Sequence, residues 1–177
     1  MNSPPENAPK LTLATDLPHD YLAFIGAITV NFAALESALA FGIWTMLGDS
    51  EEPDPRFAVV TSQLSFKQLV WMYSNLYRQC FRKADDETFE ERTKDHVRRL
   101  FKAEEDRNRV VHSMWSSTVG GEAAMMFKIT ARADGAKAKT QDFSKEQLAA
   151  IANECEHLAM ESGMCPHVER LKRRRKK

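Results

Sequence analysis

Charged and polar side chains interrupt a predicted apolar helix face at the hexad Arg107–His112. At helical spacing the residues around the hexad form that face: Val97, Leu100, Phe101, Val111, Met114 and Trp115. Glu104, Arg107 and Asn108 fall on it, where further apolar residues would be expected. Burial of an unpaired charge is costly, so these groups either form a satisfied polar network or line a site that is open to a ligand. We favour a site, because an arginine binds anions and a histidine exchanges protons near neutral pH.

The spacing within the hexad allows three residues to act on one ligand. Asn108 and His112 are four residues apart and share a helix face, whereas Arg107 lies about 140° from His112 around the helix. Arg107 reaches the same ligand only through the length of its side chain or through a distorted turn. The spacing therefore permits all three side chains to act on one ligand.

The hexad resembles the signature of HEPN (higher eukaryotes and prokaryotes nucleotide-binding) domains, in which a polar residue follows the arginine and four residues separate it from the histidine. Two further stretches lie where bacterial relatives of this kind have them. One is Asn31–Glu36 in a long opening helix, and the other is Leu64–Leu69 at the start of the second helix. The resemblance covers roughly residues 21–160. It implies a helical, dimeric, bacterial domain that is often a metal-independent endoribonuclease.

The resemblance implies cleavage of single-stranded RNA by internal transesterification, in phage defence or as a toxin. His112 would remove the 2′-hydroxyl proton or protonate the leaving 5′-oxygen, and Arg107 would neutralise the phosphorane. Asn108 would position either side chain or the phosphate. One such set per chain is sparse, so we expect a homodimer in which two sets meet. RNA is the expected substrate, and an antitoxin or another protein is a further expected partner. No cofactor or metal ion is expected.

Glu36, Glu104 and Arg109 are candidates for supporting roles, and Trp115 is a candidate for binding the substrate. Glu36 either pairs with Arg107 or Arg109 and holds the site in shape, forms a simple structural salt bridge, or is exposed. Glu104 is a similar candidate for holding the site in shape, and it could equally form only an i,i+3 salt bridge with Arg107. Trp115 either stacks a nucleobase or continues the core stripe, and the core is favoured.

Two other functions remain open. In the first, Arg107, Asn108 and His112 hold a nucleotide, RNA or a partner's helix in a non-catalytic dimerisation module. In the second, the hexad is an interface network that sets helix register, and His112 is an ordinary hydrogen-bonded histidine.

Composition predicts one globular domain in a reducing, cytoplasmic setting. The chain has 177 residues, 43% hydrophobic and 28% charged, and its three cysteines form no Cys-x-x-Cys pair. Residues 170–177 hold seven basic side chains, whereas residues 1–169 hold 18 basic and 25 acidic ones. This tail either attracts phosphate polymers or is a solubilising end. Residues 21–47 are apolar, but Asn31 and Glu36 interrupt them, so we expect a buried helix and no membrane partner.

The predicted fold is a mainly α, up-and-down bundle of four or five helices with one β-hairpin before the last helix. A lead at 1–16 precedes a domain at 17–164, with the hairpin at about 123–142 and a basic tail at 165–177. Capping signals place helix starts after Asp16, Ser65 and Ser144 and near Asp85–Asp86. The first helix is expected to end at Gly48, the third at about Ser116, and the last at the stop signals Gly163 and Pro166.

Overall fold

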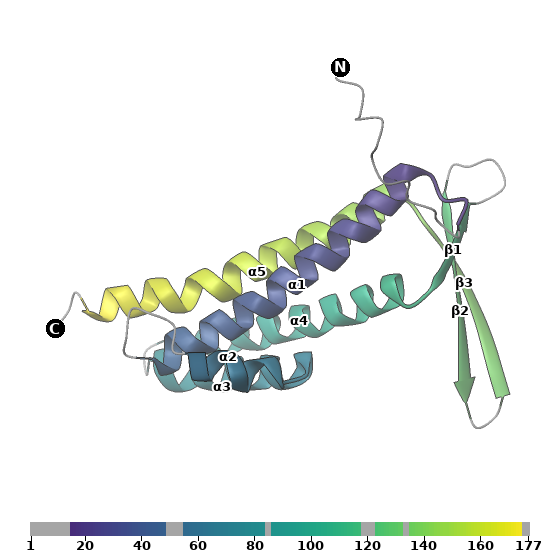
Figure 1. Ribbon diagram of the computed structural model, residues 1–177. Helices are drawn as coiled ribbons and strands as arrows, with labels where there is room; N and C mark the ends of the chain where they lie inside the picture. Colours follow the sequence, from purple (N-terminus) through teal and green to yellow (C-terminus); the bar gives the residue numbers. More distant parts are fainter. Residues whose placement is uncertain (1–14, 49–54, 84–85, 118–122, 133–134, 175–177) are drawn as a thin grey trace, which may run out of the picture.

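The computed structural model describes residues 15–48, 55–83, 86–117, 123–132 and 135–174 (Figure 1). The described chain is mainly helical and carries a three-stranded antiparallel sheet before its last helix, which confirms the predicted class. The elements in chain order are α1 (His19–Leu47), α2 (Pro55–Ser62), α3 (Phe66–Phe81), α4 (Phe89–Val111), β1 (Met114–Ser117), β2 (Ala124–Arg132), β3 (Gly135–Phe143) and α5 (Lys145–Arg174).

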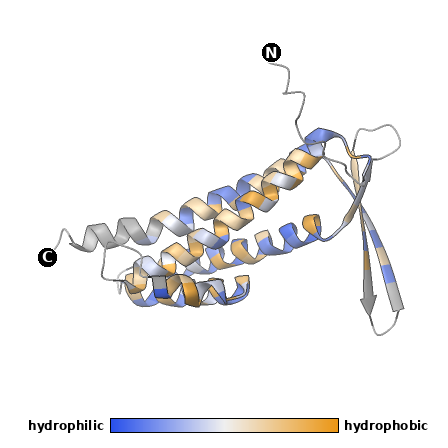
Figure 2. Cartoon of the chain, viewed as in Figure 1, coloured by the Kyte–Doolittle hydropathy of each residue, from blue (hydrophilic) through white to orange (hydrophobic). Residues whose placement is uncertain are grey.

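Helices α1 and α5 lie side by side and form the spine of the bundle (Figure 1). The expected burial of this first helix is confirmed for an apolar stripe at helical spacing: Tyr21, Ile28, Phe32, Leu35, Leu39 and Ile43. Figure 2 shows apolar residues along most of α1, while α4 mixes hydrophilic and hydrophobic positions. Among the described helices, α1 is long and apolar enough to cross a membrane, a test that buried core helices also pass.

Several predicted boundaries are confirmed because their signals are local. Ser65 and Gln68 form a capping box at α3, with both reciprocal hydrogen bonds present. At the start of α5 the Ser144 amide donates to Gln147 Oε1 at 2.9 Å, and the Gln147 amide donates to Ser144 Oγ at 3.3 Å. Gly48 ends α1, and its amide donates to the Trp44 carbonyl.

The prediction that the third helix continues to about Ser116 is wrong. Helix α4 ends at Val111, and residues 114–117 form β1, which pairs with β2 so that Met114 faces Phe127. The expected hairpin is therefore part of a three-stranded sheet. The Trp115 indole donates to the Val110 carbonyl at 2.8 Å and satisfies a group that the end of the helix leaves free.

The prediction that Asp16 caps α1 is wrong, because the N-cap residue is Pro18 and no side chain of the described residues caps the helix. The Asp16 carboxylate accepts from the Ser117 amide at 3.1 Å and from the Ser117 hydroxyl at 2.6 Å, which secures β1 to the chain before α1. Helix α2 also lies in a region for which no helix was predicted.

Helix α5 continues past Gly163 and Pro166 to Arg174, so the prediction that these residues end it is wrong. A proline has no N–H for the carbonyl four residues earlier, here that of Ser162. That carbonyl oxygen lies beside Gly42 of α1, where the two helices approach closely. The first ten residues of the predicted tail, 165–174, are thus helical.

Some predicted features fall outside the described residues. These are the lead up to residue 14, Asp85 at the expected start of the third helix, and residues 175–177 of the basic tail.

We expect Gly42→Ala to lower the free energy of unfolding by about 1–3 kcal/mol, because overpacking a core costs that much. A Cβ at Gly42 would lie 2.6 Å from Tyr73 Cε2 and 2.9 Å from the Ser162 oxygen. Gly26→Ala is the matched control, since a Cβ there meets nothing within 4 Å. It should raise the free energy of unfolding by about 0.5–1 kcal/mol, as alanine favours a helix. Urea denaturation measures both, and equal stabilities of the two variants would contradict this packing.

Candidate active site

Arg107 lies on the side of α4 that faces α1. Its Cζ is 5.1 Å from the centroid of the Phe32 ring, and its Nη1 donates to Asn108 Oδ1 at 2.8 Å. Its Nε is buried and makes no hydrogen bond within the described chain. A cation over an aromatic face is stabilised by the ring quadrupole, so Phe32 and Asn108 together hold the guanidinium in place.

The Phe32 ring brings together the three stretches on which the HEPN resemblance rests. Phe32 belongs to the stretch Asn31–Glu36, and its ring centroid is 4.7 Å from that of Phe66 in the stretch Leu64–Leu69. The Arg107 guanidinium covers the same ring. Segments far apart in the sequence therefore meet at one point in the core.

Glu36 is electrostatically coupled to Arg107 without forming an ion pair with it. Burial raises the pKa of the Glu36 carboxyl, the positive charge of Arg107 lowers it, and the nearby Glu104 raises it further. Within the described residues, no carboxylate lies within ion-pair distance of Arg107. Arg109 is paired instead with Asp106, Nη2 to Oδ1 at 2.6 Å, and its Cζ lies 5.3 Å from the Phe143 ring centroid.

His112 is the C-cap of α4, and its side chain is exposed. Its amide donates to the Asn108 carbonyl at 3.3 Å, and in the described chain its imidazole makes no hydrogen bond or ion pair. Arg107 faces α1, so the structure joins the Arg107 and Asn108 side chains, but neither side chain forms a hydrogen bond with the His112 imidazole. The imidazole is open to solvent and to other molecules.

Trp115 is half-buried and packs in the core beside Phe143, with ring centroids 5.5 Å apart. With its indole N–H bonded to Val110, this placement favours the core interpretation over nucleobase stacking.

A cavity of about 740 Å³ opens between α3, α4 and the β2–β3 hairpin. Three predicted site residues line it: Glu104, Asn108 and Arg109. Sequence reasoning missed the other polar residues of its wall and an exposed tryptophan: Lys67, Trp71, Glu105, Lys128 and Lys139. They lie on α3, α4, β2 and β3, so no local pattern could reveal that they share a cavity.

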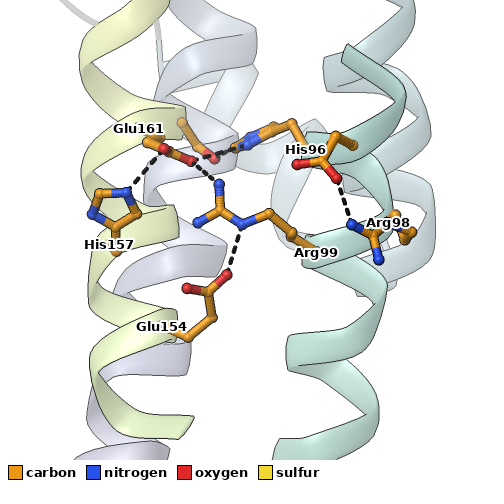
Figure 3. Close-up of polar contacts among 8 residues, drawn as sticks. His96, Arg98, Arg99, Glu154, His157 and Glu161 are labelled. Carbon is orange, nitrogen blue, oxygen red and sulfur yellow. Dashed lines mark hydrogen bonds and ion pairs between the residues drawn. The ribbon is translucent and has the colours of Figure 1, made fainter. Parts of the chain in front are cut away.

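A second polar cluster joins α4 to α5 (Figure 3). Its centre is the Glu161 carboxylate, which lies 3.0 Å from Arg99 Nη1, 3.0 Å from His157 Nε2 and 3.3 Å from His96 Nδ1. Arg99 also bonds Glu154, Nε to Oε1 at 2.8 Å. This cluster was not predicted from the sequence, although the i,i+3 spacing of His96 and Arg99 is a weak signal of it.

His96 is held by this cluster in its neutral form. Its Nε2 lies 3.1 Å from Ser162 Oγ and its Nδ1 faces Glu161, so a single tautomer satisfies both nitrogens. Burial lowers the pKa of His96, which outweighs the attraction of Glu161 for the imidazolium. We interpret the cluster as structural, because it binds two helices to each other.

The described residues include two free thiols and no metal-binding cluster. Cys80 and Cys155 are free thiols there, and burial raises the pKa of Cys155 to about 11, which suppresses its thiolate. The described residues hold no group of three or more His, Cys, Asp or Glu side chains placed to bind a metal ion.

Acidification below pH 6.5 should destabilise the protein through His96. The unfolded chain takes up the proton near the ordinary histidine pKa of about 6.5, whereas the folded chain resists it, so stability rises with pH across this window. In His96→Gln the free energy of unfolding should therefore be lower at pH 7.5 but should fall less between pH 7.5 and 5.5. His19→Gln, at an exposed position, is the control and should keep the wild-type slope. An unchanged slope in His96→Gln would rule out this role.

The structure thus brings Arg107, Asn108, Glu36 and Glu104 into one neighbourhood and leaves His112 exposed at the end of the same helix. Asn108 connects this neighbourhood to the cavity beside α3 and the hairpin. The chain matches no protein-family model, no curated protein and no solved structure.

Proposed function

We propose that the chain is a HEPN-like endoribonuclease that cleaves single-stranded RNA without a metal ion. The observation that carries the proposal is the state of Arg107: its half-buried guanidinium is held by Phe32 and Asn108, yet no carboxylate pairs with it in the described chain. Other arginines of α3 and α4 are paired, as Arg78 is with Glu90 and Arg99 with Glu154. A guanidinium that is held in position and is not paired with a carboxylate can stabilise the negative charge of a phosphate in the transition state.

The chemistry follows from these side chains. An imidazole takes the proton of the RNA 2′-hydroxyl, and that oxygen attacks the adjacent phosphorus. The bond from phosphorus to the 5′-oxygen breaks, a second imidazole returns a proton to that oxygen, and the products end in a 2′,3′-cyclic phosphate and a 5′-hydroxyl. Arg107 neutralises the phosphorane, and Asn108 keeps its guanidinium in position.

The proposal includes a homodimer. One chain supplies one imidazole in the hexad, and within the chain it does not contact Arg107. A second copy would bring a second His112 for the other half of the acid and base work, and would place an exposed imidazole against a guanidinium held by its partner.

A non-catalytic RNA-binding module is the second candidate function. The observation that favours it is the missing contact between His112 and Arg107 within one chain. Such a module would hold RNA beside Arg107 and Asn108 and release it intact.

His112→Ala and Arg107→Ala should each lower the cleavage rate of RNA in excess chelator by at least about 100-fold, because each removes a group that acts in the transition state. Arg107→Lys should restore little, since an ammonium lacks the planar fork that bonds Asn108. Arg98→Ala is the control, as Arg98 lies on the same helix with an exposed side chain. Product ends are identified by mass spectrometry, and circular dichroism verifies folding.

Wild-type rates in both alanine variants would refute the nuclease proposal. Tight binding of RNA that stays intact with the wild-type chain would favour the binding module instead.

Co-expression of differently tagged His112→Ala and Arg107→Ala chains should give hybrid dimers that regain a measurable part of the activity lost by each variant alone. The reason is that a hybrid carries one intact arginine and one intact histidine on opposite chains, and the absence of the second histidine limits the recovery to a part. The cleavage rate of hybrids isolated through both tags is the measurement. Inactive hybrids, together with active wild-type monomers, would exclude a shared site.

A further inference from the structure

Two lysines face each other directly on the β2–β3 hairpin. Lys128 and Lys139 are partners in the antiparallel register, and both line the 740 Å³ cavity. Like charges opposite each other destabilise a strand pair. Among the described residues, no carboxylate lies within ion-pair distance of either lysine. An anion bound between them would remove this repulsion.

An exposed tryptophan lies across the cavity from the hairpin. Trp71 of α3 is 54% exposed, and its ring rests against Phe101 of α4 with centroids 5.7 Å apart. Phe101 thus supports one part of the indole and leaves the rest open to the cavity. Lys67 lies one helical turn before Trp71 and lines the same cavity. A supported aromatic face beside cations is the arrangement on which single-stranded nucleic acids bind.

The charge balance of the wall favours an anion. Three lysines line the cavity against two glutamates, and one of these, Glu105, lies 3.7 Å from Lys102 outside it. Arg109 is neutralised by Asp106. The remaining polar wall residue, Asn108, accepts a hydrogen bond from Arg107, so one residue both lines the cavity and contacts the proposed catalytic arginine.

We propose that this cavity is the track along which single-stranded RNA enters the site, with phosphates at Lys128, Lys139 and Lys67 and an unstacked base on Trp71. The inference rests on the proposed function for what happens to the RNA, but the binding itself does not depend on cleavage. A duplex is disfavoured because its bases are stacked on each other and cannot stack on Trp71.

The test is the affinity of the full chain for a fluorescent 12-nucleotide RNA, measured by anisotropy in the His112→Ala background so that the RNA stays intact. Lys128→Glu/Lys139→Glu should weaken binding by at least about 10-fold and reduce the slope of log affinity against log salt by about 1.4, for two lost phosphate contacts. Lys83→Glu/Lys94→Glu is the control: it changes the net charge equally, at exposed positions outside the cavity. It should have little effect on either quantity.

Trp71→Ala should weaken binding by about 5- to 100-fold, the usual effect of losing one base stack, and Trp71→Phe should restore part of it. Double-stranded RNA should bind more weakly than the single strand, and only the single strand should be sensitive to Trp71. A single-stranded DNA of the same sequence shows whether the 2′-hydroxyl contributes.

A single Lys128→Glu exchange separates binding from folding. It turns the repulsive cross-strand pair into an attractive one and should raise the melting temperature by about 1–3 °C while it weakens RNA binding. A structural role of Lys128 would not produce opposite effects on these two measurements.

Equal losses of affinity in the cavity and control double variants, or no effect of Trp71→Ala, would refute the proposal that single-stranded RNA binds in this cavity. These outcomes are independent of the nuclease proposal. If RNA is never cut but the cavity variants lose binding, the track stands and the cleavage proposal fails; if RNA is cut and the cavity variants bind it normally, the reverse holds.

Discussion

A permanent charge on the core side of α4 constrains the arrangement of the candidate site. The Arg107 guanidinium cannot lose its proton, and burial against apolar residues is unfavourable unless something compensates for lost water. Here the compensation comes from the face of Phe32 and the amide oxygen of Asn108. The ring of Phe32 is in turn packed on Phe66, so α1, α3 and α4 are tied together by the group that holds the cation. Local packing and the candidate chemistry therefore depend on the same contact.

Charged side chains are paired on one side of α4, and one arginine on the other side has no ion-pair partner within the described chain. Toward α5, Arg99 and His96 meet Glu154 and Glu161 in a closed network in which each charged group has a partner (Figure 3). Toward the cavity, Asn108 lies beside an arginine that has no such partner, and Lys128 and Lys139 repel each other across the hairpin. Paired charges fix the register of helices, whereas unpaired charges leave attraction available for a ligand. This contrast is why we place function on the cavity side.

The sequence was sufficient for features that depend on neighbouring residues. The stripe of α1, the capping boxes at Ser65 and Ser144 and the end of α1 at Gly48 are local, because a helix period and a cap involve residues within one or two turns. The polar interruption at Arg107 and Asn108 was visible for the same reason. The end of α4 was not, because Met114 and Trp115 continue an apolar helical period equally well, and only pairing with β2 makes them a strand.

By itself, then, the sequence determined a mainly helical domain and singled out the hexad as unusual. The tertiary structure decided which groups meet there. The Arg107 guanidinium lies over the Phe32 ring, Arg109 forms an ion pair with Asp106, and Trp115 packs in the core. The tertiary structure also decided that α5 continues past Pro166, and it gathered Lys67, Trp71 and Lys139 around one cavity. Such contacts join residues far apart in the chain, and their energies depend on surfaces that exist only once the helices have packed.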